Sequence, residues 1–203
     1  IFNRLNLSDY STFWVSGIGG FKRMEIDWDA FKGFSGVQRI LKYDDFEYNG
    51  PRFNIGPSAP EQFTLNRISE LVKEKADNKP SAFFYETVNS HYKFDSPTQT
   101  LNQWQDCQTA KREDFKPLTQ LNSKSKENYF KAMKYQWNSM LDLLKNQKDT
   151  PYIYVIFGDH QPPMITSPEN SFKTPFHVIT NINLDKSYWD NLNFSSKLKL
   201  DLD

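Results

Sequence analysis

The chain has 203 residues, of which 37% are hydrophobic and 16% aromatic, so it is long enough to bury the core of one sizeable domain. Its 25 basic residues balance its 25 acidic ones, which argues against nucleic acid or an anionic membrane surface as a partner. The sequence contains no apolar run of about 18 residues that would span a bilayer. It begins without methionine, and we expect a longer protein in which any membrane anchor lies outside this sequence. The single cysteine, Cys107, predicts a buried or incidental thiol.

A strand and a glycine-containing loop are predicted near the N-terminus. Residues 11–17 have a strand-like pattern and end in the glycines of residues 17–20, where the backbone can approach a ligand closely. Arg23 follows this loop. A planar guanidinium suits a phosphate or sulfate group, which it can contact through two hydrogen bonds, although an isolated basic residue is more often solvated surface.

Two helices are predicted between this loop and the middle of the chain. Asp27 marks the start of the first, because carboxylates stabilise a helix N-terminus, and residues 37–41 are interpreted as its continuation beyond a glycine break. Ser58 is the predicted cap of the second helix, whose apolar residues between positions 65 and 72 form one stripe.

Each later helix is followed by a strand of buried type. Residues 82–88 are mostly apolar and follow the second helix, and residues 152–157 follow a long helix whose apolar stripe extends over residues 129–144. Both strands are expected to be buried on both faces, as strands inside a parallel sheet are. The alternation of helix and buried strand predicts an α/β fold, with a mostly parallel central sheet and helices on both faces.

A carboxylate and an imidazole follow the strand of residues 152–157. Gly158 ends this strand, and Asp159 and His160 come directly after it. Open α/β sheets place their ligand sites at the carboxyl ends of the strands, and this pair of donors suits a divalent ion such as Zn²⁺ or Mn²⁺. The alternative is a capping aspartate beside a surface histidine. We favour the metal site, because the strand is long and two prolines stiffen the loop that follows.

Three other polar residues lie within or directly after the predicted strands. His91 follows the strand of residues 82–88 and projects into the same crevice as His160 if the two strands are neighbours. A hydrogen-bonded loop histidine is an equally weighted alternative for His91. His177 is interpreted as a sheet histidine with a local partner, and Glu86 as a structural carboxylate.

Three segments of the sequence resemble motifs of one enzyme superfamily. They are Phe157-Gly158-Asp159-His160, the strand that ends in Ser90-His91, and the stretch from Phe13 to Arg23. These segments resemble the later part of the sulfatase-like catalytic domain of the alkaline phosphatase superfamily, in particular its branch of lipoteichoic acid synthases and phosphoglycerol and phosphoethanolamine transferases. The resemblance implies that residues 1–203 form the C-terminal part of a single sulfatase-like α/β domain with an alkaline phosphatase-like fold, incomplete in this chain.

The resemblance also implies roles for four residues. Asp159 and His160 would coordinate a catalytic divalent ion (Mn²⁺, Zn²⁺ or Ca²⁺), while His91 and Arg23 would bind the oxygens of a phosphate or sulfate group. The hydroxyl nucleophile is expected upstream, because residues 1–10 contain no counterpart of it. This chain is therefore expected to be inactive alone.

The implied function is the metal-dependent transfer or hydrolysis of a phospho- or sulfo-ester, with a cell-envelope phospholipid or glycan as the expected substrate. The expected location is the bacterial inner membrane, with this domain facing the periplasm or the cell exterior. One alternative is a sulfatase or phosphodiesterase that acts on soluble esters. The other is a non-catalytic domain that binds glycans or lipid headgroups on the same scaffold.

Overall fold

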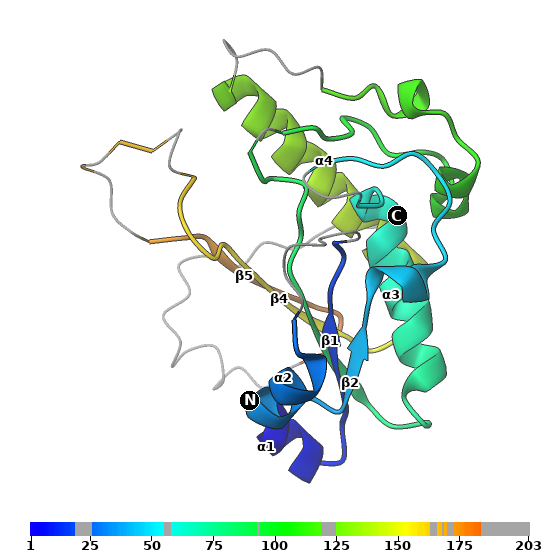
Figure 1. Cartoon of the computed structure of the whole chain (residues 1–203), viewed down its shortest axis with the longest axis vertical. Coiled ribbons are helices and arrows are strands. Elements are labelled where there is room, and N and C mark those ends of the chain that lie inside the picture. The colour runs from blue at the N-terminus through cyan, green and yellow to red at the C-terminus, as the bar shows by residue number, and fades with distance from the viewer. Residues whose placement is uncertain are drawn as a thin grey trace. The chain divides into compact units, whose positions relative to one another are not determined.

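The computed structural model of the chain describes most of the sequence. The described residues are 1–18, 26–54, 58–92, 94–118, 125–162, 166–167, 169 and 173–183. The chain divides into two compact units, Ile1–Met140 and Leu141–Asp203, and each is described by itself (Figure 1). The boundary falls within the helix α4 (Ser125–Asn146).

A parallel sheet of three strands lies at the centre of the first unit. The strands are β1 (Ser11–Val15), β2 (Arg39–Leu41) and β3 (Ser81–Tyr85), in the order β2-β1-β3. Because all of them run in the same direction, their carboxyl ends lie at one edge of the sheet. The predicted α/β fold with a parallel sheet is confirmed.

The helices of the first unit follow from local sequence signals. They are α1 (Phe2–Leu7), α2 (Trp28–Ser35) and α3 (Glu61–Lys75), with the short 3-10 helices η1 (Tyr43–Phe46), η2 (Trp104–Gln108) and η3 (Arg112–Phe115). The Asp27 carboxylate accepts a hydrogen bond from the Ala30 N–H at 2.9 Å, which caps α2 as predicted.

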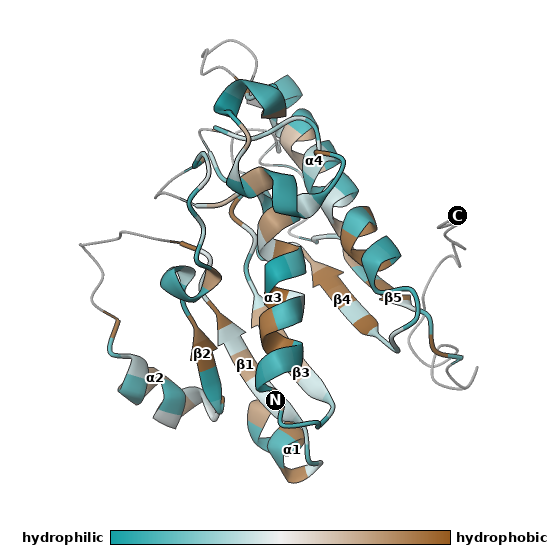
Figure 2. Ribbon diagram, turned by 90° about the vertical axis from the view of Figure 1, so that its right-hand side faces the viewer, coloured by the Kyte–Doolittle hydropathy of each residue, from teal (hydrophilic) through white to brown (hydrophobic). Residues whose placement is uncertain are grey.

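The apolar core of this unit joins the sheet to α3, which lies over the strands (Figure 2). Its buried members come from β1 and β2 (Phe13, Val15, Leu41), from α3 (Phe63, Ile68, Leu71, Val72) and from the connecting segments (Phe53, Cys107, Phe115). Cys107 is a buried thiol, as predicted. The long connection between β3 and α4 thus contributes side chains to the core.

Two predictions about helix ends are wrong. Residues 37–41 do not continue the first helix, because Gly36 has a left-handed backbone with φ of +74° that ends α2, and β2 follows. Ser58 does not cap α3, because its hydroxyl donates to the Phe53 carbonyl at 2.6 Å instead. α3 begins after Pro60, a residue whose fixed φ suits a helix entry.

The second unit contains a two-stranded antiparallel sheet. Its strands are β4 (Ile153–Phe157) and β5 (Phe176–Thr180). The prediction that residues 152–157 are buried on both faces is wrong, because Ile153, Val155 and Phe157 are each about half exposed. His177 lies in β5 opposite Ile156, the strand position that the sequence predicts.

Candidate active site

The Asp159–His160 pair follows β4 at its carboxyl end. The Gly158 N–H donates to the Pro175 carbonyl at 3.2 Å, so the two strands remain joined up to the residue before the pair. The His160 backbone N–H donates to Asp159 Oδ1 at 2.9 Å, which fixes the carboxylate beside the imidazole. Both side chains are about two-thirds exposed, at 66% for Asp159 and 68% for His160. A ligand can therefore reach both of them from solvent.

The hydrogen bonds of His160 leave one ring nitrogen able to bind a metal. His160 Nδ1 lies 2.8 Å from the Gln161 carbonyl oxygen, and because a carbonyl only accepts, Nδ1 carries the proton. Nε2 then keeps its lone pair, and it lies 3.6 Å from Asp159 Oδ2. Two ligands about 2.1 Å from one tetrahedral ion are separated by about 3.4 Å, so this pair fits a divalent cation.

A complete metal site needs donors beyond this pair. Within the part of the chain that the structure describes, no group of three or more His, Cys, Asp or Glu side chains is arranged to hold a metal ion. Asp159 and His160 would therefore supply two of the ligands.

The first unit places His91 on an exposed turn after β3. The His91 N–H donates to the Val88 carbonyl at 3.1 Å, and the Phe94 N–H donates to the His91 carbonyl at 2.9 Å. His91 Nδ1 faces the Tyr92 carbonyl, which leaves Nε2 available to a ligand. Arg23, the other predicted substrate-binding residue, lies outside the described residues.

Glu61 is a buried carboxylate that the sequence reasoning did not single out as a site residue. Its side chain is at the start of α3, is 1% exposed, and accepts hydrogen bonds from the Tyr85 hydroxyl and from the backbone N–H groups of Val88 and Asn89. Desolvation by burial raises the pKa of Glu61 to about 7, against the lowering effect of these donors. An acidic residue in the first turn of a helix is common, so the sequence carries no signal that this one is buried.

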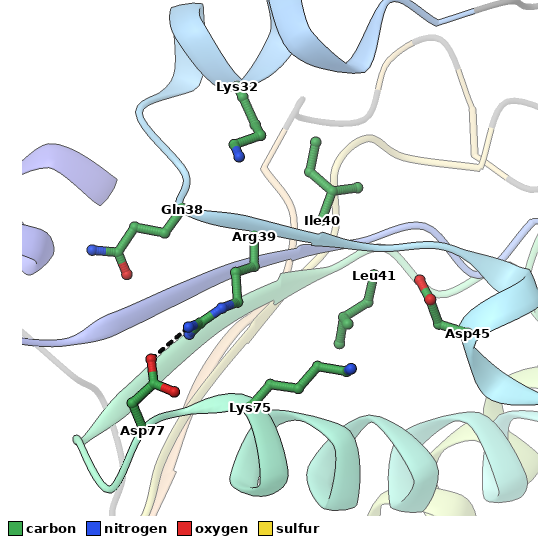
Figure 3. Close-up of a pocket in the computed structure, with 8 residues that line it drawn as sticks. All are labelled: Lys32, Gln38, Arg39, Ile40, Leu41, Asp45, Lys75 and Asp77. Carbon is green, nitrogen blue, oxygen red and sulfur yellow. Dashed lines mark hydrogen bonds and ion pairs between the residues drawn. The ribbon is translucent and has the colours of Figure 1, made fainter.

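Two other features of the first unit are Glu86 and a surface groove. Glu86, interpreted as a structural carboxylate, is exposed immediately beyond the end of β3. A groove of about 410 Å³ runs beside β2, where Lys32, Arg39, Lys75 and Asp77 are among its lining residues (Figure 3). His91, the predicted site residue that the structure describes in the first unit, is not among the lining residues of this groove.

Two solved structures share the fold of the chain. The lipoteichoic acid synthase LtaP from Listeria monocytogenes matches with a TM-score of 0.59 and 19% identity over 87% of this chain and 44% of that chain. A protein in the alkaline phosphatase superfamily from Vibrio parahaemolyticus matches with a TM-score of 0.56 and 17% identity over 88% of this chain and 40% of that one. The fold is therefore alkaline phosphatase-like, and the chain spans less than half the length of each structure.

Residues 1–193 match the sequence model of the sulfatase family, and the chain belongs to that family. This finding confirms the sulfatase-like, alkaline phosphatase superfamily resemblance. No curated protein is similar enough in sequence to count as a match. Among the described residues, no helix is both long and apolar enough to cross a membrane.

Proposed function

We propose that the chain contributes a metal-binding and substrate-binding part of an enzyme that transfers or hydrolyses phospho- or sulfo-esters. The observation that carries this proposal is the Asp159–His160 pair, whose Oδ2 and Nε2 atoms are 3.6 Å apart and exposed at the end of β4. Membership of the sulfatase family supports ester chemistry. A bound divalent ion would supply positive charge to stabilise the anionic transition state of such a reaction.

In this proposal His91 and Arg23 bind the anionic oxygens of the ester. The exposed imidazole of His91 can donate a hydrogen bond through Nε2 when it is protonated, and the Arg23 guanidinium can donate two in parallel. No nucleophile is assigned within this chain, which spans less than half of each structural neighbour.

We further propose a substrate in the bacterial cell envelope, such as a phospholipid or a glycan. The support is the structural likeness to a protein named as a lipoteichoic acid synthase. The proposed location is the inner membrane, with this domain on the periplasmic or exterior side and any anchor outside the residues given. Membrane fractionation of the native protein, followed by protease treatment of intact cells, tests the location.

Calorimetric titration of the native protein with Mn²⁺ tests the metal site, to which this chain would supply two of the ligands. We expect one binding event per chain in the wild type, and its loss in Asp159→Ala and in His160→Ala, because each variant removes one of two adjacent ligands. His177→Ala is the matched control, since it removes an imidazole from β5 in the same unit. Equal binding in all four proteins, or no binding in any of them, would contradict the metal site and favour a non-catalytic domain that binds glycans or headgroups.

A further inference from the structure

The Glu61 carboxylate connects the start of α3 to the turn that carries His91. Its Oε1 atom accepts hydrogen bonds from the Val88 N–H at 2.8 Å and from the Asn89 N–H at 3.2 Å, and its Oε2 atom accepts from the Tyr85 hydroxyl at 2.8 Å. All three donors belong to the end of β3 and the residues that follow it. Glu61 therefore binds to the turn after β3.

The peptide group that joins Val88 to Asn89 links this carboxylate to His91. Its N–H, which belongs to Asn89, donates to Glu61, and its carbonyl, which belongs to Val88, accepts from the His91 N–H at 3.1 Å. The same carbonyl also accepts from the side-chain amide of Asn54. Only two hydrogen bonds therefore separate the Glu61 carboxylate from the backbone of His91, and bonds in such a chain strengthen one another.

The neighbouring residue Asn89 anchors the turn from the other side. Asn89 is buried, its Nδ2 atom donates to the Ala132 carbonyl of α4 at 2.7 Å, and its Oδ1 atom accepts from the Ser96 hydroxyl at 2.5 Å. Its backbone N–H is satisfied by Glu61. The turn is thus held between α3 and α4. On the α3 side, the Glu61 carboxylate accepts the hydrogen bonds of the Val88 and Asn89 backbone N–H groups.

We propose that Glu61 is a positioning residue, which fixes the turn of residues 86–91 and thereby holds the His91 imidazole where it meets the anionic group of the substrate. This inference rests on the substrate-binding role of His91 in the proposed function. Because Glu61 is buried, it would act through the turn and not by contact with the substrate.

The bonding pattern predicts which substitutions preserve the turn. In Glu61→Gln the side-chain amide oxygen still accepts hydrogen bonds from both backbone N–H groups. The amide nitrogen donates to the Tyr85 hydroxyl, which can accept as well as donate. In Glu61→Asp the charge remains but the side chain is shorter by one methylene, so the oxygens withdraw from Val88 and Asn89. If position matters more than charge, Gln preserves the turn and Asp does not.

Amide exchange and anion titration by NMR test this inference in four proteins: the wild type, Glu61→Gln, Glu61→Asp and Ser139→Ala. The last is a control for general loss of stability, because Ser139 is buried and the hydrogen bond from its hydroxyl to the Tyr135 carbonyl lies within α4. Exchange rates are read at the Val88 and Asn89 amides. Inorganic phosphate is the anion, and the ring resonances of His91 report its binding.

We expect Glu61→Asp to raise the amide exchange rates at Val88 and Asn89 by about tenfold. The phosphate response of His91 should weaken by a similar factor. This is the size of effect expected for the loss of one buried hydrogen bond. Glu61→Gln and Ser139→Ala should retain the wild-type phosphate response. An unchanged response in Glu61→Asp, or a loss in Glu61→Gln equal to that in Glu61→Asp, would overturn the positioning role alone. No response in the wild type would instead overturn the role of His91 in the proposed function, and the inference with it.

Discussion

The Tyr85 hydroxyl donates a hydrogen bond to the Glu61 carboxylate at 2.8 Å. This contact joins the last residue of β3 to the first residue of α3, at the carboxyl edge of the parallel sheet. It forms inside the protein, where a carboxylate is stable only if donors replace its hydration shell. The ionisation of Glu61 is therefore coupled to the stability of the fold.

The first prediction concerns stability and pH. Burial raises the pKa of Glu61 from its ordinary value of 4.5 to about 7, so the folded chain binds this proton more tightly than the unfolded chain does. The resulting stabilisation is complete below about pH 4.5 and is lost as the pH rises through about 7. Over this range the free energy of unfolding should fall by about 3 kcal/mol relative to Glu61→Gln, which does not titrate. Urea denaturation of both proteins at several pH values measures the difference, and a difference that is constant with pH would contradict the account.

The second prediction concerns Gly17, which lies just beyond β1 and packs against Tyr85. A Cβ at position 17 would lie 2.8 Å from Tyr85 Cε2 and 3.0 Å from its hydroxyl oxygen. Gly17→Ala should displace the ring and lower the free energy of unfolding by about 1 to 3 kcal/mol. Thermal or urea denaturation gives this value.

A glycine in α2 provides the control for this substitution. A Cβ at Gly33 meets nothing within 4 Å, and alanine favours a helix over glycine. Gly33→Ala should therefore be neutral or stabilising by up to about 1 kcal/mol. Equal effects of the two substitutions would show that the close contact with Tyr85 is not the cause.

The third prediction concerns Cys107. This thiol is fully buried in the core and lies 3.9 Å from Gln62 Oε1. A thiol-specific reagent should therefore modify it only when the chain opens, at a rate that increases with denaturant. Rapid and complete modification of the native protein would contradict the burial of Cys107. As the control, full modification by the same reagent in concentrated denaturant confirms that the thiol is intact.

Local patterns predicted the elements that local interactions determine. The start of α2 at Asp27 and the long helix α4 were predicted from capping and periodicity, since both signals lie within a few neighbouring residues. Gly36 shows the limit of such reasoning. Its left-handed backbone separates α2 from β2, but residues 37–41, of which three are apolar, carry too short a pattern to distinguish helix from strand.

The burial of β4 could not be predicted from its own residues. An apolar run favours burial on both faces, yet Val155 is half exposed while its neighbour Tyr154 is less so, because burial depends on which elements cover each face. Glu61 is the opposite case. Its place in the first turn of a helix is typical of an exposed acidic residue, yet the carboxylate is buried. Residues after β3, distant in the sequence, donate hydrogen bonds to it. By contrast, adjacency in the chain was enough to predict that Asp159 and His160 lie together.

The proposed metal site requires His160 to offer an unprotonated Nε2 to a metal shared with Asp159. Long-range ¹⁵N–¹H NMR spectra of the imidazole, recorded with and without Zn²⁺, measure this directly. We expect a proton on Nδ1 in the metal-free protein and a Zn²⁺-dependent shift of the His160 Nε2 resonance that disappears in Asp159→Ala. A proton on Nε2, or an Nε2 resonance that Zn²⁺ does not move, would contradict it.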